Sequence, residues 1–117
     1  MDRFTQEDFE YFYIIIHLME NILDLDKKVT LTVDKRFFNK YVTNPRFNKT
    51  DLGACIRETG MVWLNEKELV SETRALTAAV IIHEMLHIKY PLKTEKWISS
   101  ATDSYLGPLW SVSKTLK

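Results

Sequence analysis

Residues 75–91 constrain the fold of this chain more than any other stretch. They form a long apolar run that contains strong helix formers and ends at Pro91, a residue that stops helices. Two histidines, His83 and His87, lie within the run in the pattern H-E-x-x-H. Because residues four apart lie on one face of an α-helix, both imidazoles should point the same way. A helix that is apolar almost all round should be buried between a sheet and other helices.

The H-E-x-x-H pattern predicts a zinc site. Two imidazoles one helical turn apart can bind one Zn²⁺ ion, which we expect as the cofactor. Glu84 is next to the first histidine, so it could take a proton from a zinc-bound water and act as a general base without binding the metal. The alternative interpretation is a buried structural helix whose histidines form only local hydrogen bonds.

A catalytic zinc site needs a third protein ligand. No histidine follows His87 and Cys55 is the single cysteine, so this ligand must be a carboxylate. Glu95 and Asp103 are the two acidic residues C-terminal to the motif. We favour Glu95, because a chain that turns back at Pro91 can bring it to the metal-binding side. A glutamate in the first turn of a helix is also explained by the helix dipole, and Asp103 stays as the alternative ligand.

Length and charge restrict the class of protein. A chain of 117 residues suits one domain, residues 1–117, and its 16 basic and 16 acidic residues create no overall field for nucleic acid. The single cysteine excludes an intrachain disulfide and is typical of a reducing compartment. The apolar stretch 11–19 is too short to cross a membrane and lacks the basic start of a signal peptide. We therefore expect a cytoplasmic protein that binds neither nucleic acid nor membrane.

Two more long helices are predicted on either side of the motif. An N-terminal helix should run from Gln6 to about Asp24, with Thr5 as its N-cap and Asp8 completing a capping box. A last helix should begin after an N-cap at Thr94 and stop at residues 107–108, a Gly-Pro pair.

The strand signals complete an α+β fold. Residues 29–33 alternate apolar and hydroxyl side chains, as in a half-buried strand. Residues 52–57 and 61–65 should form a hairpin, in which Gly60 is free to adopt positive φ. With the motif helix, which Ser71 can cap, these elements predict a sheet of about three strands packed on that helix.

Two connecting segments have weaker patterns. Asp34 can cap a short helix through Tyr41, which Pro45 would end. Residues 65–68 are polar and should form a loop that leaves the hairpin.

These motifs resemble those of the zincin metallopeptidases of the gluzincin type. The resemblance depends on the run 80–91 with its H-E-x-x-H helix, the preceding strands and the acidic residue on the next helix, and it covers about residues 28–106. The small size is closest to the minigluzincins, which are minimal metallopeptidase-like domains. The resemblance implies a zincin-like fold in which His83, His87 and Glu95 bind zinc and Glu84 is the general base. Larger gluzincins place their glutamate further downstream in an N-E-x-x-x-D-type segment, which this chain lacks.

The activity that the resemblance implies is hydrolysis of peptide bonds in peptides or unstructured proteins. A substrate could add to strand 52–57 as a further strand, and Tyr90 or Tyr105 could stabilise the oxyanion. Minimal members of the family resemble zymogens, so residues 107–117 are either a tail that occludes the zinc or a segment packed on the outside. Two other classes stay open: a zinc-binding regulatory or interaction module without proteolysis, and a helical protein with a coincidental motif.

Overall fold

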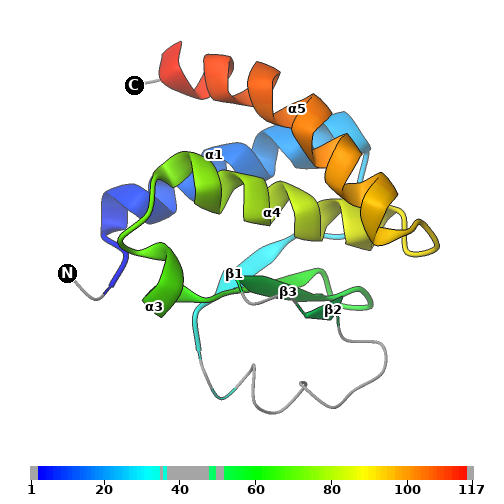
Figure 1. The fold of residues 1–117 in the computed structure, drawn as a ribbon, viewed down its shortest axis with the longest axis horizontal. Helices are drawn as coiled ribbons and strands as arrows, with labels where there is room; N and C mark the ends of the chain where they lie inside the picture. The colour runs from blue at the N-terminus through cyan, green and yellow to red at the C-terminus, as the bar shows by residue number, and fades with distance from the viewer. Residues whose placement is uncertain (1–2, 35, 37–47, 50–51, 116–117) are drawn as a thin grey trace.

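Helix α4 (Arg74–Lys89), which carries the H-E-x-x-H motif, is the central element of the fold. In the computed structural model, which describes residues 3–34, 36, 48–49 and 52–115, α4 lies between a sheet and two other long helices (Figure 1). Ile81, Ile82, Met85 and Leu86 are all fully buried. The prediction of a core helix is confirmed, because most residues between Thr77 and Ile88 are buried.

Helix α1 (Gln6–Leu23) begins at the predicted capping box. The Thr5 hydroxyl accepts a hydrogen bond from the backbone N–H of Asp8, and the Asp8 carboxylate accepts one from the backbone N–H of Thr5. Arg74 Nε, at the start of α4, also donates to Asp8 at 2.8 Å. This carboxylate therefore both caps α1 and ties it to the motif helix.

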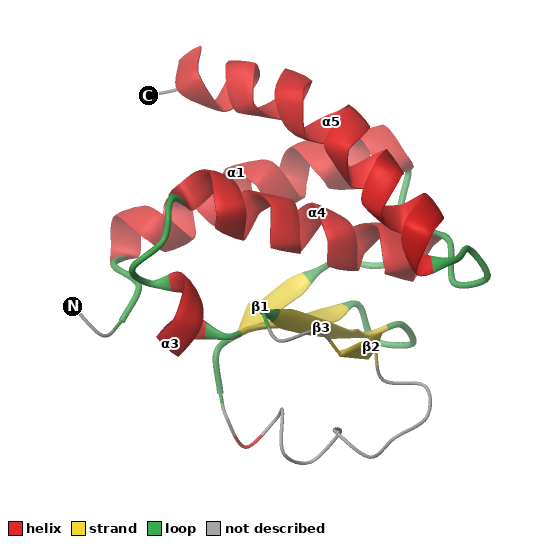
Figure 2. Cartoon of the chain, viewed as in Figure 1, coloured by secondary structure: helices red, strands yellow, loops and turns green. Residues whose placement is uncertain are grey.

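The sheet lies on the other side of α4 (Figure 2) and contains four strands in the order β1-β4-β3-β2. The three predicted strands are present as β1 (Thr30–Thr32), β3 (Gly53–Ile56) and β4 (Met61–Leu64). β1 pairs with β4 in parallel, and β3 pairs with β4 as an antiparallel hairpin. Gly60, at the end of the hairpin turn, has φ of 75°, as predicted. The α+β class is confirmed, and the sheet is mixed and has one strand more than the three predicted.

Strand β3 is not an edge strand. A two-residue strand, β2 (Asn48–Lys49), pairs with it on the side away from β4, in the register Asn48 to Cys55 and Lys49 to Ala54. No strand pattern marks β2 in the sequence, where it follows a proline-containing polar stretch. The prediction that strand 52–57 offers an exposed edge to a substrate is therefore wrong, because β2 and β4 hydrogen-bond to β3 on its two sides.

Two predicted boundaries before α4 are also wrong. The segment predicted as a polar loop forms a short helix, α3 (Glu66–Leu69), because the Asn65 side chain accepts a hydrogen bond from the backbone N–H of Glu68. Helix α4 is capped by Thr73 and not by Ser71, since the Thr73 hydroxyl accepts from the backbone N–H of Leu76. Most of the short helix predicted after Asp34 falls on residues 35 and 37–41, which lie outside the described residues.

Helix α5 (Glu95–Thr115) begins where predicted but does not stop at residues 107–108. The Thr94 hydroxyl accepts a hydrogen bond from the backbone N–H of Trp97, which confirms the N-cap. Pro108 removes one helical hydrogen bond, to the carbonyl of Ser104, and Ser104 is exposed, so water can solvate that carbonyl. The backbone beyond Gly107 therefore continues α5, away from the end that carries Glu95 (Figure 1).

No helix among the residues described here has the length and apolar character needed to cross a lipid bilayer.

Candidate metal centre

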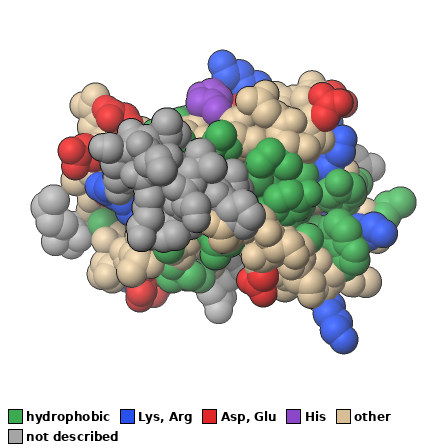
Figure 3. Space-filling view, turned by 90° about the horizontal axis from the view of Figure 1, so that it is seen from above, with side chains coloured by type: hydrophobic (Ala, Val, Ile, Leu, Met, Phe, Trp, Pro, Cys, Tyr) green, Lys and Arg blue, Asp and Glu red, His purple; other side chains and the backbone are tan. Residues whose placement is uncertain are grey.

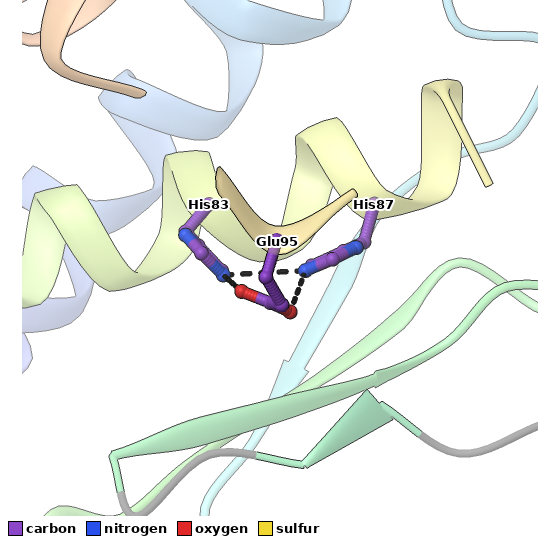
Figure 4. A group of neighbouring side chains, drawn as sticks. All are labelled: His83, His87 and Glu95. Carbon is purple, nitrogen blue, oxygen red and sulfur yellow. Dashed lines mark hydrogen bonds and ion pairs between the residues drawn. The ribbon is translucent and has the colours of Figure 1, made fainter. Parts of the chain in front are cut away.

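Three side chains from two helices converge on one point (Figure 4). His83 and His87 come from successive turns of α4, and Glu95 is the first residue of α5. Each carboxylate oxygen of Glu95 faces a different imidazole. Oε2 lies 3.1 Å from His83 Nε2, and Oε1 lies 2.6 Å from His87 Nε2. The two Nε2 atoms are 3.2 Å apart. One nitrogen or oxygen from each residue is thus available to a common partner.

A short connection returns the chain to this point. Tyr90 ends α4 with a hydrogen bond from its backbone N–H to the carbonyl of Leu86, and the N–H of Lys93 binds the carbonyl of Tyr90. Thr94 then caps α5, which packs back along α4. Because α5 begins immediately after this turn, its first side chain, Glu95, lies over the histidine-bearing face of α4 (Figure 4).

The donor spacing suits a small divalent cation. Donors that lie about 2.0–2.1 Å from a tetrahedral zinc ion are separated by about 3.3 Å. The distances among His83, His87 and Glu95 are close to that value, and a small outward movement of the Glu95 carboxylate, which is 62% exposed, would equalise them. These three residues could therefore supply three ligands to one metal ion and leave its fourth coordination position open.

The environment of His87 favours the neutral imidazole that metal binding requires. It is almost completely buried, and this burial lowers its pKa, while the charge of Glu95 acts in the opposite direction without reversing the effect. A neutral imidazole has a free nitrogen lone pair for a cation. The other ring nitrogen, Nδ1, is buried and has no hydrogen-bond partner within the described chain. This nitrogen lacks the acceptor that usually orients a metal-bound histidine.

Glu84 is turned towards the sheet. Its side chain is fully buried, and the thiol of Cys55 on β3 lies against its carboxyl group as a hydrogen-bond donor. Burial raises the pKa of Glu84 to about 8; the Cys55 thiol and Arg57 lower it, and the negative charge of Glu95 raises it. One carboxyl oxygen, Oε1, has no hydrogen-bond partner among the described residues. The carboxyl is thus held beside the metal-binding group, in an environment that favours its neutral form.

A cavity of about 290 Å³ opens beside His83 and Glu84. It lies between α4, α5 and Leu52, the residue that precedes β3. Its lining also includes Ala79, Val80 and Asp103. Asp103, the alternative third ligand, faces this cavity and is not part of the converging group. The carboxylate that meets both imidazoles is Glu95.

The two tyrosines considered for oxyanion stabilisation lie elsewhere. Tyr90 and Tyr105 line a different hollow, together with Trp97, on the side of α5 opposite to Asp103. Seen from above, hydrophobic side chains gather towards the end of the molecule where α5 begins (Figure 3), and Trp97 is 38% exposed there. Within the described part of the chain, neither tyrosine belongs to the group of side chains that converges on the metal site. The third histidine, His17, is exposed on α1 and interacts with Glu20.

The sequence motifs do not identify Cys55 as a neighbour of the site, although strand periodicity offers a signal. Gly53 and Cys55 are two residues apart on β3, so they share one face, and that face meets α4. The position of Glu84 on α4, rotated from the histidines by one residue, points it at this face.

No protein-family model, no curated protein and no solved structure matches this chain.

Proposed function

We propose that this chain is a small zinc-dependent metallopeptidase, similar in its site to the gluzincin-type zincins and closest to the minigluzincins. His83, His87 and Glu95 would hold one Zn²⁺ ion, and Glu84 would be the general base. The observation that carries the proposal is the convergence of both motif histidines with a glutamate from the next helix. A chance motif does not require Glu95 to place one oxygen on each imidazole.

Glu84 has a definite task in the proposed reaction. When bound, zinc would lower the pKa of a water ligand to about 7, polarise the scissile carbonyl and favour the ionised form of Glu84 by its charge. Glu84 would accept the proton of the attacking water and deliver it to the leaving amine. Its burial against Cys55 limits the directions in which the carboxyl can move and keeps bulk water from competing for the proton.

Comparison of wild type with Glu84→Gln tests the proposal. Both proteins are loaded with zinc, their metal content is measured, and cleavage of an unstructured protein is followed by mass spectrometry. We expect Glu84→Gln to keep one zinc ion and to cleave about 10²–10⁴-fold more slowly, the range for loss of a general base. The control is Asp26→Asn, which changes an exposed acidic residue on the loop after α1, distant in sequence from Glu84. This protein should cleave at the wild-type rate. Equal cleavage by Glu84→Gln would remove Glu84 from the mechanism.

A second candidate, a zinc-binding regulatory or interaction module without proteolysis, is favoured by one observation. Strand β3, which lies against Glu84, is hydrogen-bonded on both sides, so it offers no free strand edge to an extended substrate. Zinc binding without any cleavage by wild-type protein would support this candidate. Absence of zinc uptake on titration would reject both proposals.

A further inference from the structure

We propose that the cavity beside His83 binds a lysine or arginine side chain of the substrate, next to the bond that is cleaved, and that Asp103 selects it. This inference depends on the proposed peptidase function and adds a substrate class to it. The cavity and the metal-binding group share His83, so a substrate whose carbonyl lies at the metal would place a neighbouring side chain in this cavity.

The walls of the cavity are mainly apolar. Leu52, Ala79 and Val80 contribute aliphatic surface from the sheet side and from α4. Thr102 also faces the cavity, but its hydroxyl donates to the carbonyl of Ile98 at 2.8 Å, so its proton is not available to a ligand. Such walls favour an extended aliphatic stem over a short polar side chain.

Asp103 supplies the charge. It is exposed on α5, lines the same cavity and has no ion-pair or hydrogen-bond partner in the described part of the chain. The other carboxyl group of the cavity, Glu84, is fully buried and assigned to proton transfer. An aliphatic wall with one free carboxylate at the rim complements a side chain with an aliphatic stem and a cationic end. Lysine and arginine have this form.

A peptide library tests the substrate class. Acetylated and amidated peptides, which have no charged termini, vary one central position and are incubated with zinc-loaded protein, and the cleaved bonds are identified by mass spectrometry. We expect cleavage beside lysine or arginine to exceed cleavage beside leucine. Asp103→Asn should lower the lysine-to-leucine ratio by up to about fivefold, the effect of losing one exposed ion pair. Asp26→Asn, which removes the same charge elsewhere, should leave the ratio unchanged.

A binding experiment separates this inference from the peptidase proposal. Calorimetry with the Glu84→Gln protein compares a lysine-containing peptide with its methionine counterpart, which has a similar stem and no charge. We expect tighter binding of the lysine peptide, with the difference lost when Asp103→Asn is added. Cleavage without any preference for basic residues, or a preference that Asp103→Asn does not reduce, would overturn the role of Asp103 and leave the peptidase proposal intact. Selective binding without cleavage would overturn the peptidase proposal alone.

Discussion

Gly53 on β3 lies so close to Val80 on α4 that a Cβ atom on residue 53 would be 2.7 Å from Cγ1 of Val80. The same Cβ atom would lie 3.8 Å from Cγ of Glu84. The sheet therefore touches the motif helix at a residue without a side chain, immediately beside the proposed general base and one wall of the cavity. This close approach positions Glu84 against β3.

Substitution Gly53→Ala should lower the free energy of unfolding by about 1–3 kcal/mol, because the added methyl group overpacks this contact. Urea denaturation of both proteins measures the change. The matched control is Gly107→Ala, since an added Cβ at residue 107 would meet no described atom within 4 Å apart from its chain neighbours and its own helix backbone. Equal losses at both positions would show that the close approach to Val80 is unimportant.

Metal affinity should distinguish the two acidic residues that follow the motif. Loss of a group that only supports a metal ligand typically costs 10–100-fold in affinity, so Glu95→Gln should weaken zinc binding by at least about 100-fold. Asp103→Asn should change it less than about twofold, because Asp103 faces the cavity and not the imidazoles. Competition with a chromogenic chelator gives both constants. The reverse order of effects would make Asp103 the ligand.

Acid should weaken the link between α1 and α4. Burial raises the pKa of Asp8, but hydrogen bonds from Thr5 and Arg74 outweigh this and hold the pKa below its ordinary value of 3.8. Because the pKa is lower in the folded state, the stabilisation is present above about pH 4 and is lost as the pH falls through the folded-state pKa.

Replacement Asp8→Asn should therefore destabilise the protein by about 1 kcal/mol near pH 7, and the difference from wild type should shrink below pH 4. Urea denaturation between pH 2.5 and 7 gives the two curves. Asp26→Asn, at a residue that is 87% exposed, should show the same pH dependence of stability as wild type. A constant difference between Asp8→Asn and wild type at every pH would argue against the assigned ion pair.

Truncation after Leu106 tests whether the C-terminal segment inhibits the site. Each helical residue advances the chain by about 1.5 Å, so Gly107 lies roughly 18 Å along α5 from Glu95. We expect unchanged zinc affinity and an unchanged cleavage rate, measured side by side with the full chain. A faster rate in the truncated protein would support a latent enzyme with an occluding tail.

The sequence alone determined the features that depend on neighbouring residues. The Thr5–Asp8 capping box and the common face of His83 and His87 follow from contacts within one or two helical turns. The Gly60 turn is equally local. The apolar character of α4 on almost all sides also predicted its central position, because such a helix has no face that prefers water.

Only the tertiary structure decided how separate elements meet. The choice of Glu95 over Asp103 depends on the angle at which α5 folds back on α4, and the pairing of β2 with β3 depends on a polar segment with no strand pattern. The contact between Cys55 and Glu84 arises where β3 crosses the motif helix. Such arrangements are set by long-range packing, whose free energy is summed over many contacts, and short-range sequence patterns do not encode them.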